Sequence, residues 1–207
     1  MNKQAKTSDD ELTKLEYRVI VNMIPDASSV LDLGCGDGKL LYLLVQNRHV
    51  KGRGVEVDED AIYECVSRGL SVSHQDIDGG LSEYGDNSFD YVILNQTLQQ
   101  VKNLERVLEE AVRVGRKVII GFPNFAYFSS RLQMIFKGKA PVTLSLPYMW
   151  YDTPNLHFLS INDFYYYCHK KKLKIEKSVF LDNNRIVKLF PNFFAEVGIF
   201  VISAELT

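Results

Sequence analysis

Residues 30–38 read Val-Leu-Asp-Leu-Gly-Cys-Gly-Asp-Gly, and the next apolar run along the chain ends in Glu56. The four residues before the first glycine predict a short buried strand. The glycines that follow form a turn without β-carbons, where the backbone bends sharply and a ligand can approach it closely. Residues 39–46 then resume as an apolar-rich helix. The stretch therefore predicts a strand that runs through a glycine-rich turn into a helix N-terminus, as in nucleotide-binding α/β proteins.

The spacing of the glycines indicates which kind of nucleotide suits the turn. A dinucleotide turn reads G-x-G-x-x-G, whereas Lys39 stands here at the position of the third glycine of that pattern. Asp32 and Asp37 place negative charge on both sides of the turn, which disfavours a diphosphate and suits a ligand with a ribose, an ammonium and a sulfonium. Glu56 is placed to accept hydrogen bonds from two ribose hydroxyls. A tight turn that binds no ligand is the alternative.

The composition is typical of a globular protein. At 207 residues and 23.7 kDa, with 46% apolar and 24% charged residues, the chain predicts one domain over residues 1–207. The net charge of −2 predicts no nucleic-acid partner, and no stretch reaches the roughly 18 apolar residues that span a membrane. Three distant cysteines predict reduced thiols in a cytoplasmic protein. The four histidines lack the spacing of metal ligands.

Strand-like and helix-like segments alternate along the chain, which predicts a doubly wound, mostly parallel α/β sheet with helices on both faces. Seven strands are expected, at 29–33, 53–57, 70–74, 89–94, 116–121, 173–181 and 197–204. Helices are expected at 11–24, 38–47, 59–68, 103–114 and about 160–172.

In such a sheet a ligand lies over the carboxyl ends of the strands, so polar residues that follow a strand are candidates for binding it. Asp76 can accept a hydrogen bond from an adenine amino group while the Ile77 N–H serves a ring nitrogen. Alternatively, Asp76 and Asp78 only shape the turn before Gly79 and Gly80. The Asn95 carbonyl is placed to bind an ammonium, or the residues around it cap a helix.

Two further segments are candidates for the reactive end of the ligand. Glu16 or Tyr17 of the first helix can reach it, although a solvated helix face also explains these residues. Residues 122–157 follow the fifth strand and are long, aromatic and rich in proline. A segment of this kind predicts an irregular lid or a partner-binding surface beside the site.

The string at 30–38 and Glu56 together resemble motif I of the Rossmann-like S-adenosylmethionine-dependent methyltransferases. Three longer strings narrow the resemblance to the methionine biosynthesis protein MetW family: Gln-Thr-Leu-Gln at 96–99, Phe-Pro-Asn-Phe at 122–125 and Leu-Pro-Tyr-x-Trp-Tyr-Asp-Thr-Pro-Asn-x-His at 146–157. The similarity extends from about Glu16 to Glu205. It implies the class I methyltransferase fold, whose last strand is antiparallel, and a cytoplasmic bacterial protein that acts beside homoserine O-acyltransferase in making methionine.

The resemblance also implies the cofactor, S-adenosylmethionine or its product S-adenosylhomocysteine. The residues expected to bind it are Asp32, Gly34, Cys35, Gly36, Gly38, Glu56, Val57, Asp76, Ile77 and Asn95.

Two hypotheses about function follow. In the first, the protein binds this cofactor and acts as a partner of the acyltransferase, so that it can sense the downstream metabolite. In the second, it is an active methyltransferase on an unidentified small molecule, a reaction that depends on positioning more than on a base. Tyr151, Asp152 and His157 are then candidate acceptor-side groups, although His157 can equally hold the turn at 154–158. The chain has no Gly-x-Ser-x-Gly motif of an acyltransferase nucleophile.

Overall fold

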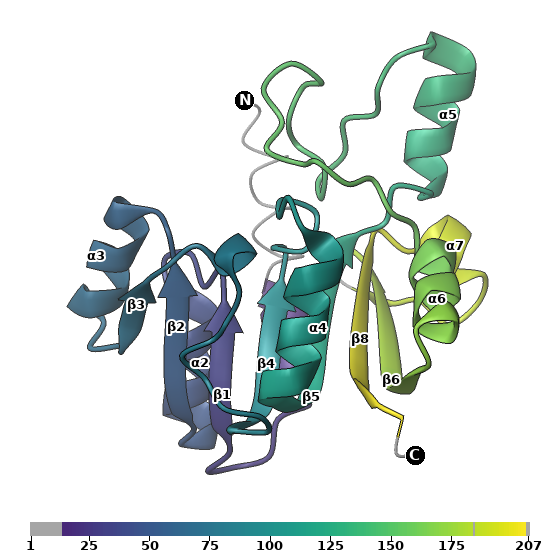
Figure 1. Ribbon diagram of the computed structural model, residues 1–207. Coiled ribbons are helices and arrows are strands. Elements are labelled where there is room, and N and C mark those ends of the chain that lie inside the picture. The colour runs from purple at the N-terminus through teal and green to yellow at the C-terminus, as the bar shows by residue number, and fades with distance from the viewer. Residues whose placement is uncertain (1–13, 184, 206–207) are drawn as a thin grey trace.

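The computed structural model describes residues 14–183 and 185–205, which build one sheet with helices packed around it (Figure 1). Its eight strands are ordered β3-β2-β1-β4-β5-β8-β6-β7. They are β1 (Ser29–Leu33), β2 (Lys51–Glu56), β3 (Val72–His74), β4 (Phe89–Asn95), β5 (Gly115–Pro123), β6 (Leu173–Asp182), β7 (Arg185–Ile186) and β8 (Val197–Ala204).

The sheet has the predicted mixture of directions. β1 pairs in parallel with β2 and β4, β2 with β3, and β4 with β5. β8 lies between β5 and β6 and is antiparallel to both. The mostly parallel sheet with an antiparallel last strand is therefore confirmed. β7 is added to the seven expected strands, because two residues after a turn pair with the end of β6. A segment of two residues has no periodicity from which to predict a strand.

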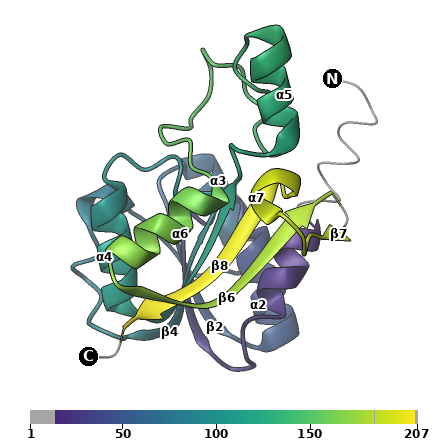
Figure 2. The ribbon, with the colours of Figure 1, turned by 90° about the vertical axis from the view of Figure 1, so that its right-hand side faces the viewer.

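Helices cover both faces of the sheet (Figure 2). The helical residues 14–21 and α2 (Lys39–Arg48) pack on one face, whereas α4 (Leu104–Val114) and α6 (Ile161–Lys170) pack on the other. Of the helix expected at 11–24, residues 11–13 lie outside the described residues, and the helical part ends before Pro25. Further helices are α3 (Glu59–Ser67), η1 (Ile77–Gly79, a 3-10 helix), α5 (Phe128–Lys137) and α7 (Pro191–Phe194).

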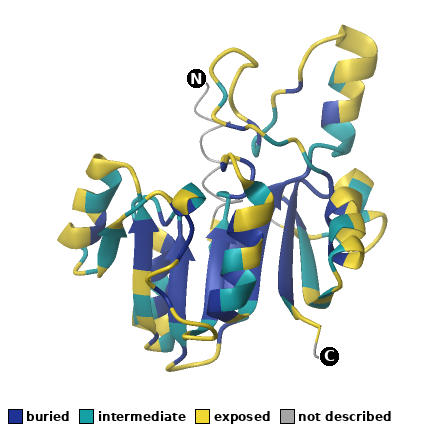
Figure 3. Ribbon diagram, in the orientation of Figure 1, coloured by how far each residue is buried: buried dark blue, intermediate teal, exposed yellow. Residues whose placement is uncertain are grey.

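The two faces have separate apolar cores, and the central strands between them are buried (Figure 3). α4 contributes Val107, Leu108 and Ala111, whose spacing of one and four residues places them on one side of a helix. In the same core the rings of Phe122 and Phe200 stack with centroids 5.7 Å apart. This packing fixes β5 and β8 against the helices and so holds the edge of the sheet where the strands end.

The segment at 122–157 is less irregular than expected. β5 extends through Pro123, and α5 occupies ten residues of the segment. The sequence of α5 contains no glycine or proline, which permits a helix, but Ser130 is its one buried residue. Phe128, Leu132 and Ile135 recur at the spacing of one helix face, so the sequence held a pattern for this helix, although none of the three is buried. α5 and the irregular residues that follow it rise above the carboxyl edge of the sheet (Figure 1). Within the described residues, no helix is long and apolar enough to cross a membrane.

Asn124 holds the base of this segment to the rest of the fold. It is fully buried, and its Nδ2 donates to the carbonyls of Asn192 (3.1 Å) and Ala195 (2.8 Å). Its Oδ1 accepts from the N–H of Ala126 (3.1 Å) and of Ile161 (3.4 Å). One side chain thus joins the end of β5, the start of α6 and the region of α7. The Phe-Pro-Asn-Phe string is explained by this structural role.

We expect Asn124→Ala to lower the free energy of unfolding by about 2–4 kcal/mol, because it leaves several buried backbone groups without a partner. Chemical denaturation measures the effect. Asn47→Ala on the exposed side of α2 is the control and should change stability little. Equal stability of the two variants would show that Asn124 does not hold the segment.

Candidate functional site

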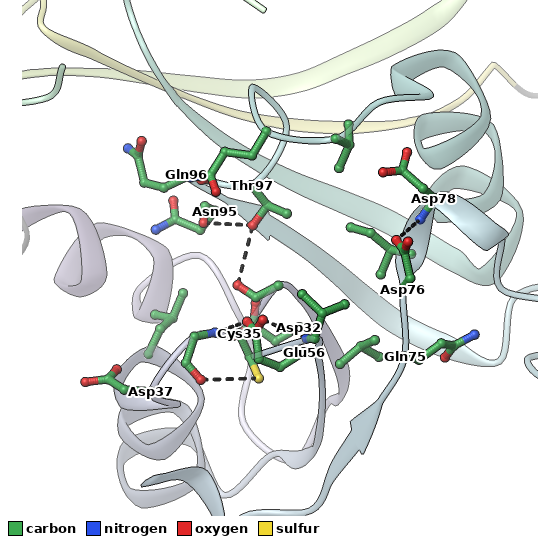
Figure 4. A pocket seen from close by; sticks show the side chains of 18 of the residues that line it. Asp32, Cys35, Asp37, Glu56, Gln75, Asp76, Asp78, Asn95, Gln96 and Thr97 are labelled. Atoms are coloured by element: carbon green, nitrogen blue, oxygen red, sulfur yellow. Dashed lines mark hydrogen bonds between the residues drawn. The ribbon is translucent and has the colours of Figure 1, made fainter. Parts of the chain in front are cut away.

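A cavity of about 500 Å³ opens at the carboxyl edge of the sheet, between the ends of β1, β2 and β4 (Figure 4). Its volume lies within the range of small-molecule sites. Nine of the ten residues predicted to bind a cofactor line this cavity, namely Asp32, Gly34, Cys35, Gly36, Glu56, Val57, Asp76, Ile77 and Asn95.

Gly36 is the position where the turn is open to a ligand. It has φ of +54°, and a β-carbon built on it would meet no atom within 4 Å. Gly34 is different, because a β-carbon there would lie 2.6 Å from the Thr97 side chain. Gly38, the tenth predicted residue, does not line the cavity; a β-carbon there would lie 2.7 Å from Cys65 Sγ. Gly36 therefore leaves room for a ligand, whereas Gly38 leaves room for the packing of α3 on α2.

Glu56 is held in a fixed orientation at the end of β2. Its Oε2 accepts from the Gly36 N–H (2.8 Å), and its Oε1 accepts from the N–H groups of Val57 (2.7 Å) and Asp58 (3.1 Å). A carboxylate offers about four acceptor positions, so about one is left in this arrangement. Glu56 can accept one ribose hydroxyl directly. A second one requires the Gly36 N–H or another donor to give up its bond.

Three backbone carbonyls converge beside the turn. The Thr97 hydroxyl lies 3.0 Å from the Leu33 carbonyl oxygen, 3.2 Å from that of Asn95 and 3.5 Å from that of Gly34. A hydroxyl carries one proton and can satisfy one of these oxygens at a time. The group of carbonyls therefore retains acceptor capacity, which suits an ammonium with its three N–H donors.

The cavity is strongly acidic. Asp32 is almost fully buried, and its burial together with the negative charge of Glu56 raises the pKa of Asp32 to about 7. Asp37 and Asp78 add further carboxylates to the wall, and among the described residues that line the cavity none is a lysine or an arginine. This electrostatic environment attracts a cation and disfavours a diphosphate.

The turn after β3 has the structural role that the sequence left open, and it also lines the cavity. Asp76 Oδ1 accepts from the Asp78 N–H (2.9 Å), so Asp76 caps η1, and it also lines the cavity. The carboxylate of Asp78 accepts from the N–H groups of Lys102 (3.0 Å) and Asn103 (2.7 Å). Asp78 thereby fixes the turn to the start of α4, and it lines the cavity together with Asp76 and Ile77.

The first helix contributes more to the site than a solvated face would. Glu16 is only 4% exposed, and it lines the cavity together with Tyr17. The Gln96 side chain donates to Glu16 Oε1 at 2.9 Å, and burial raises the pKa of Glu16 to about 7. Gln96 itself has φ of +58°, a strained conformation that is common at functional sites. The interpretation of Glu16 as a solvated residue is therefore wrong.

Several residues of the cavity wall are not among those that the sequence predicts to bind a ligand. Some of them follow β4 and lie in or next to the string at 96–99. Their position after a strand was therefore a signal in the sequence. The missed residues are Leu40, Val55, Gln75, Gln96, Thr97, Gln100 and Val101.

The candidate acceptor-side residues lie outside the cavity. The Nε2 of His157 is 2.9 Å from the Val101 carbonyl oxygen, and the His157 N–H donates to the Gln99 carbonyl at 3.0 Å. These bonds attach the segment to the loop after β4. Tyr151 is 69% exposed and packs edge-on against Trp150, with ring centroids 5.7 Å apart. No group of metal-ligating residues is present within the described residues.

Solved structures with low sequence identity share this fold. A Thermotoga maritima S-adenosylmethionine-dependent methyltransferase, described as a possible histamine N-methyltransferase, aligns with a TM-score of 0.69 at 18% identity over 96% of this chain and 92% of that one. A chain in the complex between the Haloferax volcanii Trm112 methyltransferase activator and the putative methyltransferase aligns with a TM-score of 0.69 at 14% identity, over 99% and 94%. The protein has the Rossmann-like class I methyltransferase fold.

The family follows from the sequence matches. Residues 14–202 match the model of the methionine biosynthesis protein MetW family, so the chain belongs to that family. A Rhodopirellula baltica relative, the bifunctional methionine biosynthesis protein MetXA/MetW, is 37% identical over 192 residues, which cover 88% of this chain and 31% of the relative. The chain thus spans about a third of the length of that relative.

The buried carboxyls predict how stability depends on pH. Because the folded-state pKa values of Asp32 and Glu16 lie above the ordinary values near 4, the free energy of unfolding should fall as pH rises from about 4 to about 7. The free energy of unfolding of the wild type should decrease between pH 5.5 and pH 7.5. In Asp32→Asn this decrease should be smaller by on the order of 2 kcal/mol. Denaturation of the ligand-free protein at both pH values measures it. Parallel pH profiles of the wild type and the variant would contradict the assignment.

Proposed function

We propose that the cavity binds S-adenosylmethionine or S-adenosylhomocysteine and that the protein acts in methionine biosynthesis through this ligand. The observation that carries the proposal is the free space at Gly36, where a β-carbon would meet no atom within 4 Å. This space lies beside the Glu56 carboxylate, which accepts a hydrogen bond from the Gly36 N–H. The acidic wall supports a ligand with a sulfonium or an ammonium. Membership of the MetW family supports the pathway.

Each part of the ligand has a matching group in the wall. Glu56 at the end of β2 is suited to the ribose, and Val57 with the turn at 76–77 is suited to the adenine. The carbonyls that converge on Thr97 are suited to the ammonium of the amino-acid tail. Gly34, Cys35 and Gly36 provide backbone along which the tail can lie. The thiol of Cys35 has a packing role, since a β-carbon on Gly54 would lie 2.6 Å from it.

We also propose that the segment 122–157 contributes to a surface for homoserine O-acyltransferase, in a single cytoplasmic domain that spans the chain. The name of the Rhodopirellula baltica relative joins MetXA and MetW in one polypeptide, which supports joint action of the two activities. Large apolar side chains of the segment are exposed, as expected of an interaction surface. They are Leu132, Met134, Ile135, Phe136, Val142, Tyr148, Met149, Trp150, Tyr151 and Leu156.

The second candidate function is methyl transfer to a small acceptor. The observation that favours it is the pair Glu16 and Tyr17, which face the cavity from the first helix. In-line displacement at a sulfonium depends on positioning, so these two residues can suffice if the acceptor has a free lone pair. Tyr151 and His157 do not line the same cavity, although His157 contacts the carbonyl of Val101, which does. In this alternative they would serve only through a rearrangement of the segment.

Gly36→Ala tests the ligand, with Gly69→Ala as a matched control. Both glycines have positive φ (+54° and +75°), and a β-carbon on either meets no atom within 4 Å. Each substitution should lower stability by about 1–2 kcal/mol. Gly36→Ala alone should weaken binding of S-adenosylmethionine, by about tenfold or more in calorimetry. Equal affinities of the two variants would contradict the proposed site.

Trp150→Ala tests the partner, with Tyr63→Ala as the control. Trp150 is 76% exposed on the segment, and Tyr63 is 71% exposed on α3. Truncation of an aromatic interface anchor costs about 2 kcal/mol or more, so Trp150→Ala should reduce co-purification of the acyltransferase. Affinity for S-adenosylmethionine should stay the same in both variants. If neither variant affects the complex, the segment is not the docking surface. If no complex forms and S-adenosylmethionine is turned over on a small acceptor, the second function is correct.

A further inference from the structure

A second cavity, of about 490 Å³, is lined by α5 and by other residues of the segment 122–157 and its end. An engineered apolar cavity of about 150 Å³ binds a benzene ring, so this cavity has room for more than one apolar group. Apolar and aromatic side chains form most of its wall, among them Phe125, Met134, Leu146, Tyr148, Trp150 and Phe158. None of the described residues that line it is charged. The second cavity therefore suits an uncharged, mainly apolar group.

Contacts within the protein hold the walls of the second cavity in place. The side chain of Gln133 on α5 donates to the Val142 carbonyl (2.9 Å) and accepts from the Val142 N–H (3.1 Å), which fixes the helix to the residues that follow it. The rings of Phe125 and Phe158 pack against each other with centroids 5.0 Å apart. Because these contacts need no ligand, a group that enters loses little binding free energy to ordering the site.

Asn155 supplies a polar group in this apolar wall. It is only 8% exposed, and its side chain makes no hydrogen bond to a described residue. Its N–H donates to the Thr153 hydroxyl at 3.1 Å, and the N–H groups of Leu156 and His157 donate to the Gln99 carbonyl, so the backbone around it is fixed. A buried amide without partners is unfavourable, and it needs both a donor and an acceptor to complete it. A peptide backbone offers both.

The surface around the second cavity is apolar and positively charged. Trp150 is 76% exposed and Phe136 on α5 is 79% exposed. Lys137 and Lys139 are also exposed, close in the chain to Ala140 of the wall, and neither forms a salt bridge with a described residue. A small molecule would fill the cavity and leave the apolar surroundings in water, whereas a protein segment covers both. The two lysines favour a partner whose matching surface is acidic.

We propose that the second cavity receives a large apolar side chain of a partner protein. A backbone amide beside that side chain pairs with Asn155, and acidic residues of the partner face Lys137 and Lys139. The proposal rests on the proposed function for one point, the identity of the partner as homoserine O-acyltransferase. A lipid acyl chain fits the apolar wall but has no N–H group for the Asn155 oxygen.

The test is calorimetry of the purified acyltransferase with the wild type and with Ala140→Trp, which fills the second cavity from an exposed position of its wall. The control is Ala204→Trp, which adds the same side chain at the exposed end of β8. Ala140→Trp should weaken the complex about 30-fold or more, and Ala204→Trp should bind like the wild type. Circular dichroism checks that each variant is folded.

Two further variants test the polar contacts. Asn155→Ala should weaken the complex about tenfold, and it should fold, because the Asn155 side chain has no hydrogen bond to lose within the described residues. Lys137→Glu with Lys139→Glu should weaken the complex and reduce its dependence on salt. These variants replace Ala140→Trp if that variant does not fold.

If the complex forms and all variants bind like the wild type, this proposal is overturned while the acyltransferase remains the partner. If no complex forms, the partner in the proposed function is wrong, and N-acetyl-L-leucinamide, an uncharged apolar side chain between two amides, decides the role of the cavity. In an NMR titration it should shift the signals of the Asn155 side-chain amide and the Trp150 indole in the wild type but not in Ala140→Trp. Absence of these shifts overturns the proposal.

Two other occupants have their own outcomes. Self-association of the wild type that Ala140→Trp abolishes, measured by sedimentation, would show that a second copy of the chain fills the cavity. Binding to phosphatidylglycerol vesicles that Ala140→Trp abolishes would show that lipid does. Either result overturns the proposal.

Discussion

The hydrogen bond from the Gly36 N–H to Glu56 joins the glycine turn to the end of β2, and the shape of the cavity depends on it. β1 and β2 run in parallel, so the turn begins beside the residue where β2 ends. The N–H groups of Gly34 and Cys35 both donate to the Val55 carbonyl, at 2.8 and 3.1 Å. Three consecutive N–H groups of the turn are thus fixed to one strand. Because the turn is already ordered, a ligand that binds there would lose little binding free energy to ordering the site.

Buried carboxyl groups lie together at the same edge of the sheet, and the fold itself does not need their negative charge. Arg113, for comparison, bonds Glu110 and Asp86 near the surface, where opposite charges compensate each other. Asp32 and Glu16 are buried without such a partner, and their raised pKa values record the unfavourable free energy of ionising them there. Residues that lower stability in this way are typical of binding sites, where a cationic ligand supplies the missing charge.

The sequence predicts those features that depend on local pattern. Alternating strands and helices, the glycine turn and Glu56 all follow from residue type and spacing, and the structure places them together. Neither β7 nor α5 is among the expected elements. β7 is too short to have a period, whereas α5 has apolar residues at helical spacing but lies in a long, aromatic and proline-rich segment that was expected to be irregular. The burial of Glu16 was missed because it depends on Gln96 and on the space left by Gly121, which are distant in the sequence and become neighbours only in the folded chain.

The loop after β4 connects the cavity to the segment that follows β5. Gln96 contacts Glu16 on the cavity side, and its backbone carbonyl accepts from the Gln99 side chain at 3.0 Å. The Gln99 carbonyl in turn accepts from the N–H groups of Leu156 and His157. The cavity wall and the base of the segment are therefore parts of one hydrogen-bonded unit. A ligand influences a partner only if it interacts differently with two arrangements of such a unit. Gln96 has φ of +58° and joins the two sides, because its side chain donates to Glu16 while its carbonyl accepts from Gln99.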